Sequence, residues 1–275
     1  MENHRMYKKE LDDSSAIEID EKKKPHLRVL SYNIWNNSSY WQERLSTVIR
    51  IIKSNSPDVI CLMDVNKLCW EELRDTLEKY YIVFQVFLEE GNQSGIVLFC
   101  NRDTMQIPEN TQPYYYDYNC GTGRIIGVEL IHKETGDKVH VLATALDNTP
   151  DNDYVRAEQY AVIQKVTKSL KHYILVGDFN IQSHREEIEK KLIASNMSDV
   201  WIDMGCPLKA KYTYNGRKNQ WARNKKQLRS TRIYSHTSHY NIIGFNMVGL
   251  EDPETKFAPS CHYGIMATFE GKSAH

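Results

Sequence analysis

The chain lacks long apolar runs, paired cysteines and an excess of charge of either sign. No apolar run approaches the ~18 residues that a membrane-spanning helix needs, and the polar N-terminus does not look like a secretory signal. Because 35 basic residues stand against 36 acidic ones, the formal net charge is −1. The molecule therefore has no global attraction to nucleic acid or acidic membranes, and electrostatic binding must come from local clusters of charge.

The six cysteines are scattered, without CxxC pairs or ligand-like spacing. This pattern favours a reduced, intracellular protein over a disulfide framework, and we expect a cytoplasmic or nuclear location. Apolar residues make up 41% of the chain and charged residues 26%, which is ordinary for a globular protein. The 275 residues are enough for a substantial core.

Residues 1–25 are polar and charged, and they end in Lys22-Lys23-Lys24-Pro25. We expect residues 1–25 to form a flexible leader and residues 26–275 to form one domain. The lysine run is either a solvated run of charge or a nuclear signal, and the sequence leaves both open.

From residue 27 onward, short strands alternate with amphipathic helices, without an internal repeat or a linker. This alternation predicts one α/β domain with two packed sheets. In the first helix, Leu45, Val48, Ile49 and Ile52 share one face. The expected helices are 41–54, 71–80, 153–171 (with Asp153 as N-cap) and 183–195, and the expected strands are 27–34, 58–63, 82–88, 95–100, 124–131, 138–147, 173–178, 231–235, 241–249 and 263–269.

The apolar run at residues 173–180 ends abruptly in Gly-Asp-Phe-Asn. It predicts a buried strand that delivers Asp178 and Asn180 to its own C-terminal tip. At such a tip, polar groups can handle metals or phosphates without being buried unpaired. Taken alone, the same residues could also form a plain turn from strand to loop.

Four further segments accompany this one in a characteristic order and spacing. The five segments are Leu30-Ser-Tyr-Asn33-Ile, Val59-Ile-Cys-Leu-Met-Asp64-Val, Ala143-Thr-Ala-Leu146, Gly177-Asp-Phe-Asn180 and Pro259-Ser-Cys-His262.

Together these segments resemble the endonuclease/exonuclease/phosphatase family, whose fold is a four-layer α/β sandwich of two sheets between helices. Residues 199–201, 212–214 and 228–233 are most similar to 5′-tyrosyl-DNA phosphodiesterases, and the resemblance spans about residues 27–269. It implies hydrolysis of a phosphodiester, with Mg²⁺ held by a carboxylate and a histidine that contacts the phosphate. The residues that match catalytic or helix positions of the family are Asn33, Asp178, Asn180, His262, Arg156 and Gln159.

Other positions depart from the family pattern. Asp64 stands in place of the metal-binding Glu and is about 1.5 Å shorter in reach, so we expect a weak or lost Mg²⁺ site. Ala145 replaces a histidine, while Thr231 and Cys261 each replace an aspartate. Thr231 has no charge with which to orient His262. These substitutions predict a catalytically impaired or inactive relative.

His262 and Cys261 also have simpler interpretations. Without its aspartate, His262 could be a structural histidine. A Cys261–His262 nucleophilic pair is disfavoured because adjacent strand residues point to opposite faces. A zinc site of Cys261, Asp64 and Asp178 is conceivable, but a small filler role suits Cys261 better.

Residues 217–232 carry seven basic residues and no acidic one, near several aromatic rings. This pattern predicts a patch that faces phosphates and stacks bases, and the alternative is a solvated loop. The candidate nucleic-acid-binding residues are Arg217, Lys218, Trp221, Arg223, Lys225 and Lys226.

The sequence thus favours a divergent, monomeric relative of tyrosyl-DNA phosphodiesterases. We expect its groove to bind single-stranded nucleic acid, a nucleic-acid-linked protein or a protein partner. One rival is an active Mg²⁺-dependent phosphodiesterase, either a nuclease or a phosphotyrosyl-DNA hydrolase, with a rearranged site. The other is a structural scaffold with a vestigial groove. No membrane contact is expected.

Overall fold

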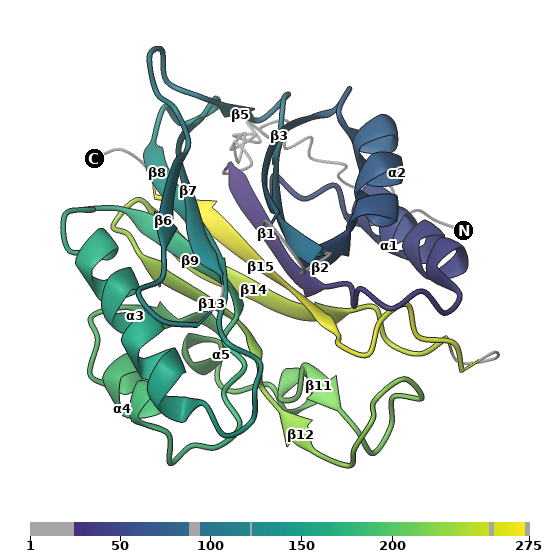
Figure 1. Ribbon diagram of the computed structural model, residues 1–275. Coiled ribbons are helices and arrows are strands. Elements are labelled where there is room, and N and C mark those ends of the chain that lie inside the picture. Colours follow the sequence, from purple (N-terminus) through teal and green to yellow (C-terminus); the bar gives the residue numbers. More distant parts are fainter. Residues whose placement is uncertain (1–24, 88–93, 122, 253–255, 273–275) are drawn as a thin grey trace, which may run out of the picture.

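Two β-sheets pack face to face, and helices cover their outer faces (Figure 1). This computed structural model describes residues 25–87, 94–121, 123–252 and 256–272. The predicted four-layer α/β sandwich is confirmed. All of the predicted leader except Pro25 lies outside the described residues, so its flexibility stays a prediction.

The first sheet has six strands in the part of the chain that the structure describes, in the order β14-β15-β1-β2-β4-β3. It is a mixed sheet, since β1 and β2 run parallel and the other neighbours run antiparallel. Its strands are β1 (His26–Asn33), β2 (Val59–Asn66), β3 (Tyr81–Phe87), β4 (Ser94–Asn101), β14 (Tyr240–Val248) and β15 (Gly264–Gly271).

The second sheet has the order β10-β13-β9-β8-β7-β5, and β6 pairs with β7. Here β8 and β9 run parallel. A short ribbon of β11 (Tyr214–Asn215) and β12 (Gln227–Leu228) lies outside both sheets. The strands of the second sheet are β5 (Met105–Gln106), β6 (Tyr114–Asp117), β7 (Arg124–His132), β8 (Lys138–Ala145), β9 (Tyr173–Asp178), β10 (Ser198–Asp199) and β13 (Thr231–His236).

Helices α1 and α2 cover the first sheet, and α3 and α4 cover the second (Figure 1). As predicted, α1 buries Leu45, Val48, Ile49 and Ile52 against its sheet. No helix among the described residues is long and apolar enough to cross a membrane. The helices are α1 (Trp41–Asn55), α2 (Lys67–Leu77), α3 (Asp153–Thr167), α4 (Glu187–Ile193), α5 (Val200–Asp203) and the 3₁₀ turn η1 (Leu208–Ala210).

The largest core cluster fills the space between the two sheets. Val29 and Leu98 of the first sheet are fully buried there with Val128 and Val176 of the second. Two further clusters lie beneath the two helical layers. Because both faces of the central strands are covered, those strands are continuous apolar runs rather than alternating ones. This double cover holds the strand tips, and the polar residues on them, in fixed positions.

Several helix boundaries differ from the prediction. Helix α2 begins at Lys67, because the side chain of Asn66 accepts a hydrogen bond from the Cys69 N–H at 2.9 Å and caps the helix. The expected N-cap role of Asp153 is wrong: the N-cap of α3 is Asn152, and the Asp153 carboxylate instead accepts from the Tyr154 N–H at 2.9 Å. Helices α3 and α4 are also shorter than expected, with α4 confined to Glu187–Ile193.

Candidate functional site

Strand register places three of the sequence-predicted positions side by side. Asp178, the last residue of β9, lies opposite Ala145 of the parallel strand β8 and opposite Thr231 of the antiparallel strand β13. Asn33 ends β1 in the other sheet. The two sheets therefore deliver their polar strand tips to the same edge of the sandwich.

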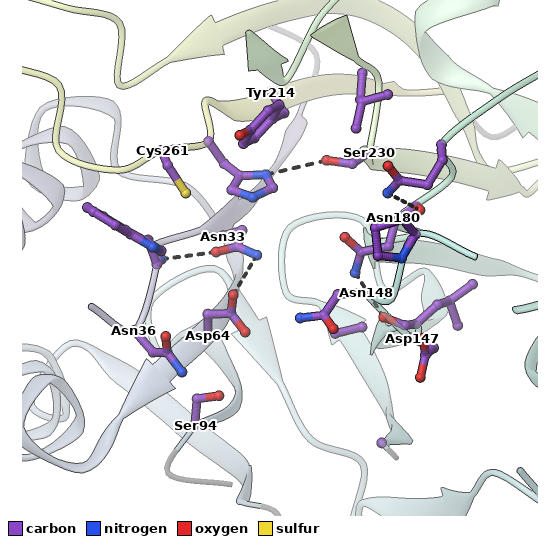
Figure 2. A pocket seen from close by; sticks show the side chains of 18 of the residues that line it. Asn33, Asn36, Asp64, Ser94, Asp147, Asn148, Asn180, Tyr214, Ser230 and Cys261 are labelled. Atoms are coloured by element: carbon purple, nitrogen blue, oxygen red, sulfur yellow. Dashed lines mark hydrogen bonds between the residues drawn. The ribbon is translucent and has the colours of Figure 1, made fainter. Parts of the chain in front are cut away.

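A cavity of about 480 Å³ opens at this edge, and Figure 2 shows the side chains around it. Asp178 and Thr231 are buried and do not line the cavity. The predicted site residues that do line it are Asn33, Asp64, Ala145, Asn180, Cys261, His262, Trp221, Arg223 and Lys226.

The amide of Asn33 joins the two sheets. Its Nδ2 donates to the Asp64 Oδ2 and to the Asp178 Oδ2, each at 3.0 Å, and its Oδ1 accepts from the Trp35 N–H at 3.0 Å. Figure 2 shows the contact between Asn33 and Asp64. Both amide hydrogens are used, so one side chain fixes the positions of two carboxylates.

Asp64 sits at an irregularity in strand β2, where the pairing with β4 shifts between Leu62 and Val65. Its backbone is left-handed, with φ at 55°, a conformation that Asp tolerates better than most residues. Burial raises the pKa of the Asp64 carboxyl, and the negative charge of Asp178 raises it further, against the lowering effect of the Asn33 hydrogen bond. Burial thus disfavours the charged form of Asp64 relative to an exposed aspartate.

Asp178 and Asn180 form a compact turn beyond β9. The Asp178 Oδ1 accepts from the Asn180 N–H at 3.1 Å, and the Asn180 Nδ2 donates to the Leu146 carbonyl at 2.8 Å. Gly177 precedes them because a Cβ there would lie 1.9 Å from the Thr144 carbonyl oxygen. The predicted strand tip is therefore present, with the Asn180 side chain at the cavity wall.

His262 reaches the cavity from the segment before β15. The Tyr214 ring packs edge-on against it, with centroids 5.2 Å apart. The His262 Nδ1 lies 3.4 Å from the Ser230 Oγ and 3.6 Å from the Asp178 Oδ2. The Thr231 Oγ1, by contrast, is buried without a hydrogen-bond partner. The Ser230 Oγ is thus closer to the His262 Nδ1 than the Asp178 carboxylate is. The sequence did not single out Ser230.

Cys261 and His262 both line the cavity, so the expectation that they point to opposite faces is wrong. The alternation rule does not apply, because both residues precede the first residue of β15, Gly264. Burial, with the nearby charges of Asp64 and Asp178, raises the pKa of the Cys261 thiol to about 12. Within the described ranges, no three His, Cys, Asp or Glu side chains form a group that could hold a metal ion.

A buried ion pair supports one wall of the cavity. Arg156 donates to the two Glu186 carboxylate oxygens at 2.8 and 2.9 Å and to the Thr149 carbonyl at 2.7 Å. The Gln159 Oε1 accepts from the Asp147 N–H at 2.8 Å. The Arg-x-x-Gln element therefore positions the loop that carries Asp147. Glu186 belongs to no motif and could not be predicted as the partner of Arg156.

The basic segment divides into two parts. Arg217, Lys218, Arg223, Lys225 and Lys226 are exposed. The other two cations of the segment are paired, Arg229 with Asp199 at 2.7 Å and Arg232 with Glu189 at 2.8 Å.

Trp221 is more structural than the sequence suggested. Its Nε1 donates to the Ala258 carbonyl at 2.6 Å, and its ring contacts Trp35 and Tyr40, with centroids 5.6 and 5.9 Å apart. Trp35 and Trp221 both line the cavity, so an aromatic group forms part of its rim.

Comparison with known proteins is consistent with this geometry. The model of the endonuclease/exonuclease/phosphatase family matches residues 30–242. A 5′-tyrosyl-DNA phosphodiesterase of Caenorhabditis briggsae is 24% identical over 236 residues, which cover 82% of this chain and 64% of that protein. Tyrosyl-DNA phosphodiesterase 2 of Xenopus tropicalis is 24% identical over 277 residues, which cover 95% of this chain and 71% of that protein.

Solved structures show the same fold. The crystal structure of D. rerio TDP2 complexed with single-strand DNA product superposes with a TM-score of 0.79 at 17% identity, covering 89% of this chain and 99% of that one. Truncated Caenorhabditis elegans TDP2 gives a TM-score of 0.76 at 21% identity, covering 90% and 98%. This chain thus spans about two thirds of the length of the sequence relatives and nearly all of these two crystallised chains.

Proposed function

Because the chain belongs to the endonuclease/exonuclease/phosphatase family, we propose that its cavity binds a phosphodiester of single-stranded nucleic acid and hydrolyses it poorly or not at all. The observation that carries this proposal is the surroundings of Asp178. The carboxylate lies between Ala145 and Thr231 in register, and neither neighbour can carry charge.

Retained groups support binding of a phosphodiester. Asn33 holds the Asp64 and Asp178 carboxylates, while Asn180 and His262 line the cavity where an oxyanion would lie. Amide and imidazole donors of this kind hydrogen-bond phosphoryl oxygens without needing a metal. Asn33, Asp178, Asn180 and His262 are also positions that match the family pattern.

Substituted groups support a loss of rate. Removing one transition-state donor costs roughly 10²–10³ in rate, and Ala145 removes an imidazole. Losing an orienting carboxylate cost ~10⁴ in the serine proteases, and Thr231 stands where the family pattern has such a carboxylate. Such losses do not add in full, because the groups act as a unit. We expect turnover at least ~10³ below that of an intact family member.

Asp64 is the residue that would hold Mg²⁺, which supplies charge neutralisation at the phosphoryl oxygens when bound. A single carboxylate fits this ion, since Mg²⁺ is often held by one or two carboxylates together with water and substrate phosphates. The burial that raises the pKa of the Asp64 carboxyl disfavours its charged form, which is the form that holds a cation, and this supports weak binding.

The cavity rim supports a nucleic-acid ligand. Arg223 and Lys226 line the same cavity as Trp35 and Trp221, and this combination of cations and rings is typical of single-strand binding. Lys225 is also exposed next to them. The D. rerio TDP2 structure contains a single-strand DNA product, which suggests the class of ligand.

Asp147 favours a second candidate, an active phosphodiesterase with a rearranged site. It lines the cavity wall away from Asp64 (Figure 2). However, its Oδ1 already accepts from the Thr149 N–H at 2.9 Å and from the Asn152 amide at 3.1 Å. We therefore rank this candidate second.

Fluorescence anisotropy with a short labelled oligothymidylate tests the binding proposal. Affinity should fall with salt by about 0.7 log units per log unit of salt for each phosphate neutralised. Replacing Arg223, Lys225 and Lys226 by Ala should weaken binding and lower this slope, with little change in unfolding temperature, because exposed charges contribute little to stability.

A matched control removes three exposed lysines, at 165, 168 and 171, near the far end of α3. This control makes the same change in net charge and should leave binding nearly unaltered. No binding at low salt, or equal weakening by both triple variants, would contradict a specific groove.

A further inference from the structure

A chain of hydroxyl groups runs from the protein interior to His262. It begins at the Thr213 Oγ1, which accepts from the backbone N–H groups of Ser230 and Thr231, each at 3.0 Å. It continues to the Ser230 Oγ at 3.4 Å and from there to the His262 Nδ1 at 3.4 Å. The contact of Ser230 with the imidazole is visible in Figure 2.

Counting donors and acceptors fixes the direction of this chain. A hydroxyl oxygen has two lone pairs, and both lone pairs of Thr213 are taken by backbone donors. The Thr213 hydroxyl must therefore donate its own hydrogen, and the Ser230 Oγ at 3.4 Å accepts it. The Ser230 hydroxyl then has its own hydrogen left to donate. The His262 Nδ1, at 3.4 Å, is the side-chain acceptor within reach.

We infer that Ser230 is a positioning residue, which donates to the His262 Nδ1 and favours the tautomer with its proton on Nε2. This inference rests on the proposed function, because it assigns the form of the histidine that would face a phosphoryl oxygen. His262 would present its Nε2–H as a donor to the cavity. A carboxylate that accepts from the ring would instead favour a proton on Nδ1.

The competing contact is weaker in geometry. The Asp178 Oδ2 lies 3.6 Å from the His262 Nδ1, beyond hydrogen-bonding distance. That oxygen already accepts from the Asn33 amide at 3.0 Å. Among the described residues, the Thr231 Oγ1 has no hydrogen-bond partner. The serine therefore controls the tautomer.

Nitrogen-15 NMR of histidine-labelled protein tests the inference directly, since the chemical shifts of the two ring nitrogens report which one carries the proton. Spectra are recorded without substrate at about pH 8.5, roughly two units above the ordinary histidine pKa. His262 is assigned among the ten histidines by the signal lost in His262→Gln. The wild-type ring should show a protonated Nε2 and an unprotonated Nδ1.

Ser230→Ala should shift the His262 population towards the Nδ1–H tautomer, because Asp178 becomes the nearest acceptor. Ser31→Ala is the control: Ser31 is also fully buried, and its Oγ has no hydrogen-bond partner, so this variant should leave the His262 signals unchanged. A wild-type ring protonated on Nδ1 would overturn the inference, and so would an unaltered tautomer in Ser230→Ala. If Ser230→Ala fails to fold, the wild-type spectrum alone decides.

Because no substrate is present, this result is independent of the proposed function. If His262 carries its proton on Nε2 but the protein does not bind DNA, only the proposed function is contradicted. If His262 carries its proton on Nδ1 and the protein binds DNA, only the positioning role of Ser230 is contradicted.

Discussion

Thr213 and Thr231 are two threonines that lie equally deep, at 1% exposure each, yet use their hydroxyl groups differently. Thr213 accepts from two backbone N–H groups, whereas the Thr231 Oγ1 has no partner. An unmade hydrogen bond to a buried group costs about 1–3 kcal/mol. The same substitution should therefore have different effects at the two positions.

Thr213→Val should lower the free energy of unfolding by about 2–4 kcal/mol, because two buried N–H groups lose their acceptor. Thr231→Val should be neutral or slightly stabilising, because it removes an unsatisfied hydroxyl without changing shape. Denaturant unfolding of both variants measures the difference. Equal destabilisation would mean that the Thr231 hydroxyl has a partner in solution.

Asp64 is expected to lower stability as the pH rises. Burial and the Asp178 charge raise its folded-state pKa above the unfolded value of ~3.9. Below the unfolded pKa both states are protonated and the folded state carries no penalty. As the pH rises through the folded pKa, the unfolded state ionises more readily, so stability is lost.

Asp64→Asn should therefore raise the unfolding temperature at pH 7.5 relative to wild type, and the gain should shrink as the pH approaches about 4. Thermal unfolding in EDTA at a series of pH values measures this. Asn also tolerates the left-handed backbone of this position, so strain does not obscure the effect. A gain that does not depend on pH would show that the Asp64 pKa is not raised.

The residues of the candidate site are easier to predict from the sequence than the contacts between them. Asn33, Asn180 and His262 were found because they lie at strand tips or match family motifs. Ser230 could not be found, because a serine beside a substituted aspartate carries no pattern of its own. Its contact with the imidazole depends on how β13 meets the segment before β15.

At the scale of elements, helix α3 links the cavity wall to the second sheet. Arg156 is fully buried and pairs with Glu186, which is 6% exposed, and it also holds the carbonyls of the loop behind Asp147. A buried ion pair contributes little net stability, but removing one partner leaves an uncompensated charge. The pair should therefore be sensitive to single substitution.

Glu186→Ala should lower the free energy of unfolding by about 3–5 kcal/mol. The control is Glu187→Ala in the next position, whose pairing with Lys190 is more than half exposed and which should cost less than about 1 kcal/mol. Denaturant unfolding compares the two. Similar small costs would mean that water or another group compensates Arg156.

The sequence predicted the long elements well, because buried strands and amphipathic helices have strong periodicity. It did not predict the strands β5, β6, β10, β11 and β12, which are two to four residues long. Such short strands depend on a neighbour for pairing and leave little pattern. The boundary of α2 was missed because the capping by Asn66 is a local side-chain contact.

At the scale of the whole molecule, the two-sheet sandwich agrees with the family fold and brings five segments, spread from Leu30 to His262, to one edge. Ala145 and Cys261, two of the positions that depart from the family pattern, line the cavity there, together with Asn33, Asn180 and His262, which match it. The expected monomeric state, the protein partner and the cytoplasmic or nuclear location stay predictions. We expect this groove to bind a phosphodiester of single-stranded nucleic acid and to hydrolyse it slowly or not at all.

The most direct test is single-turnover cleavage of a 5′-phosphotyrosyl oligonucleotide with saturating protein, in Mg²⁺, in Mn²⁺ and in EDTA. An intact family member is the positive control, and anisotropy on the same oligonucleotide verifies saturation. We predict that the oligonucleotide is bound but cleaved at least ~10³-fold more slowly than by the control. Cleavage near the control rate that disappears in EDTA would contradict the proposed loss of hydrolysis. It would favour a rearranged active site around Asp147.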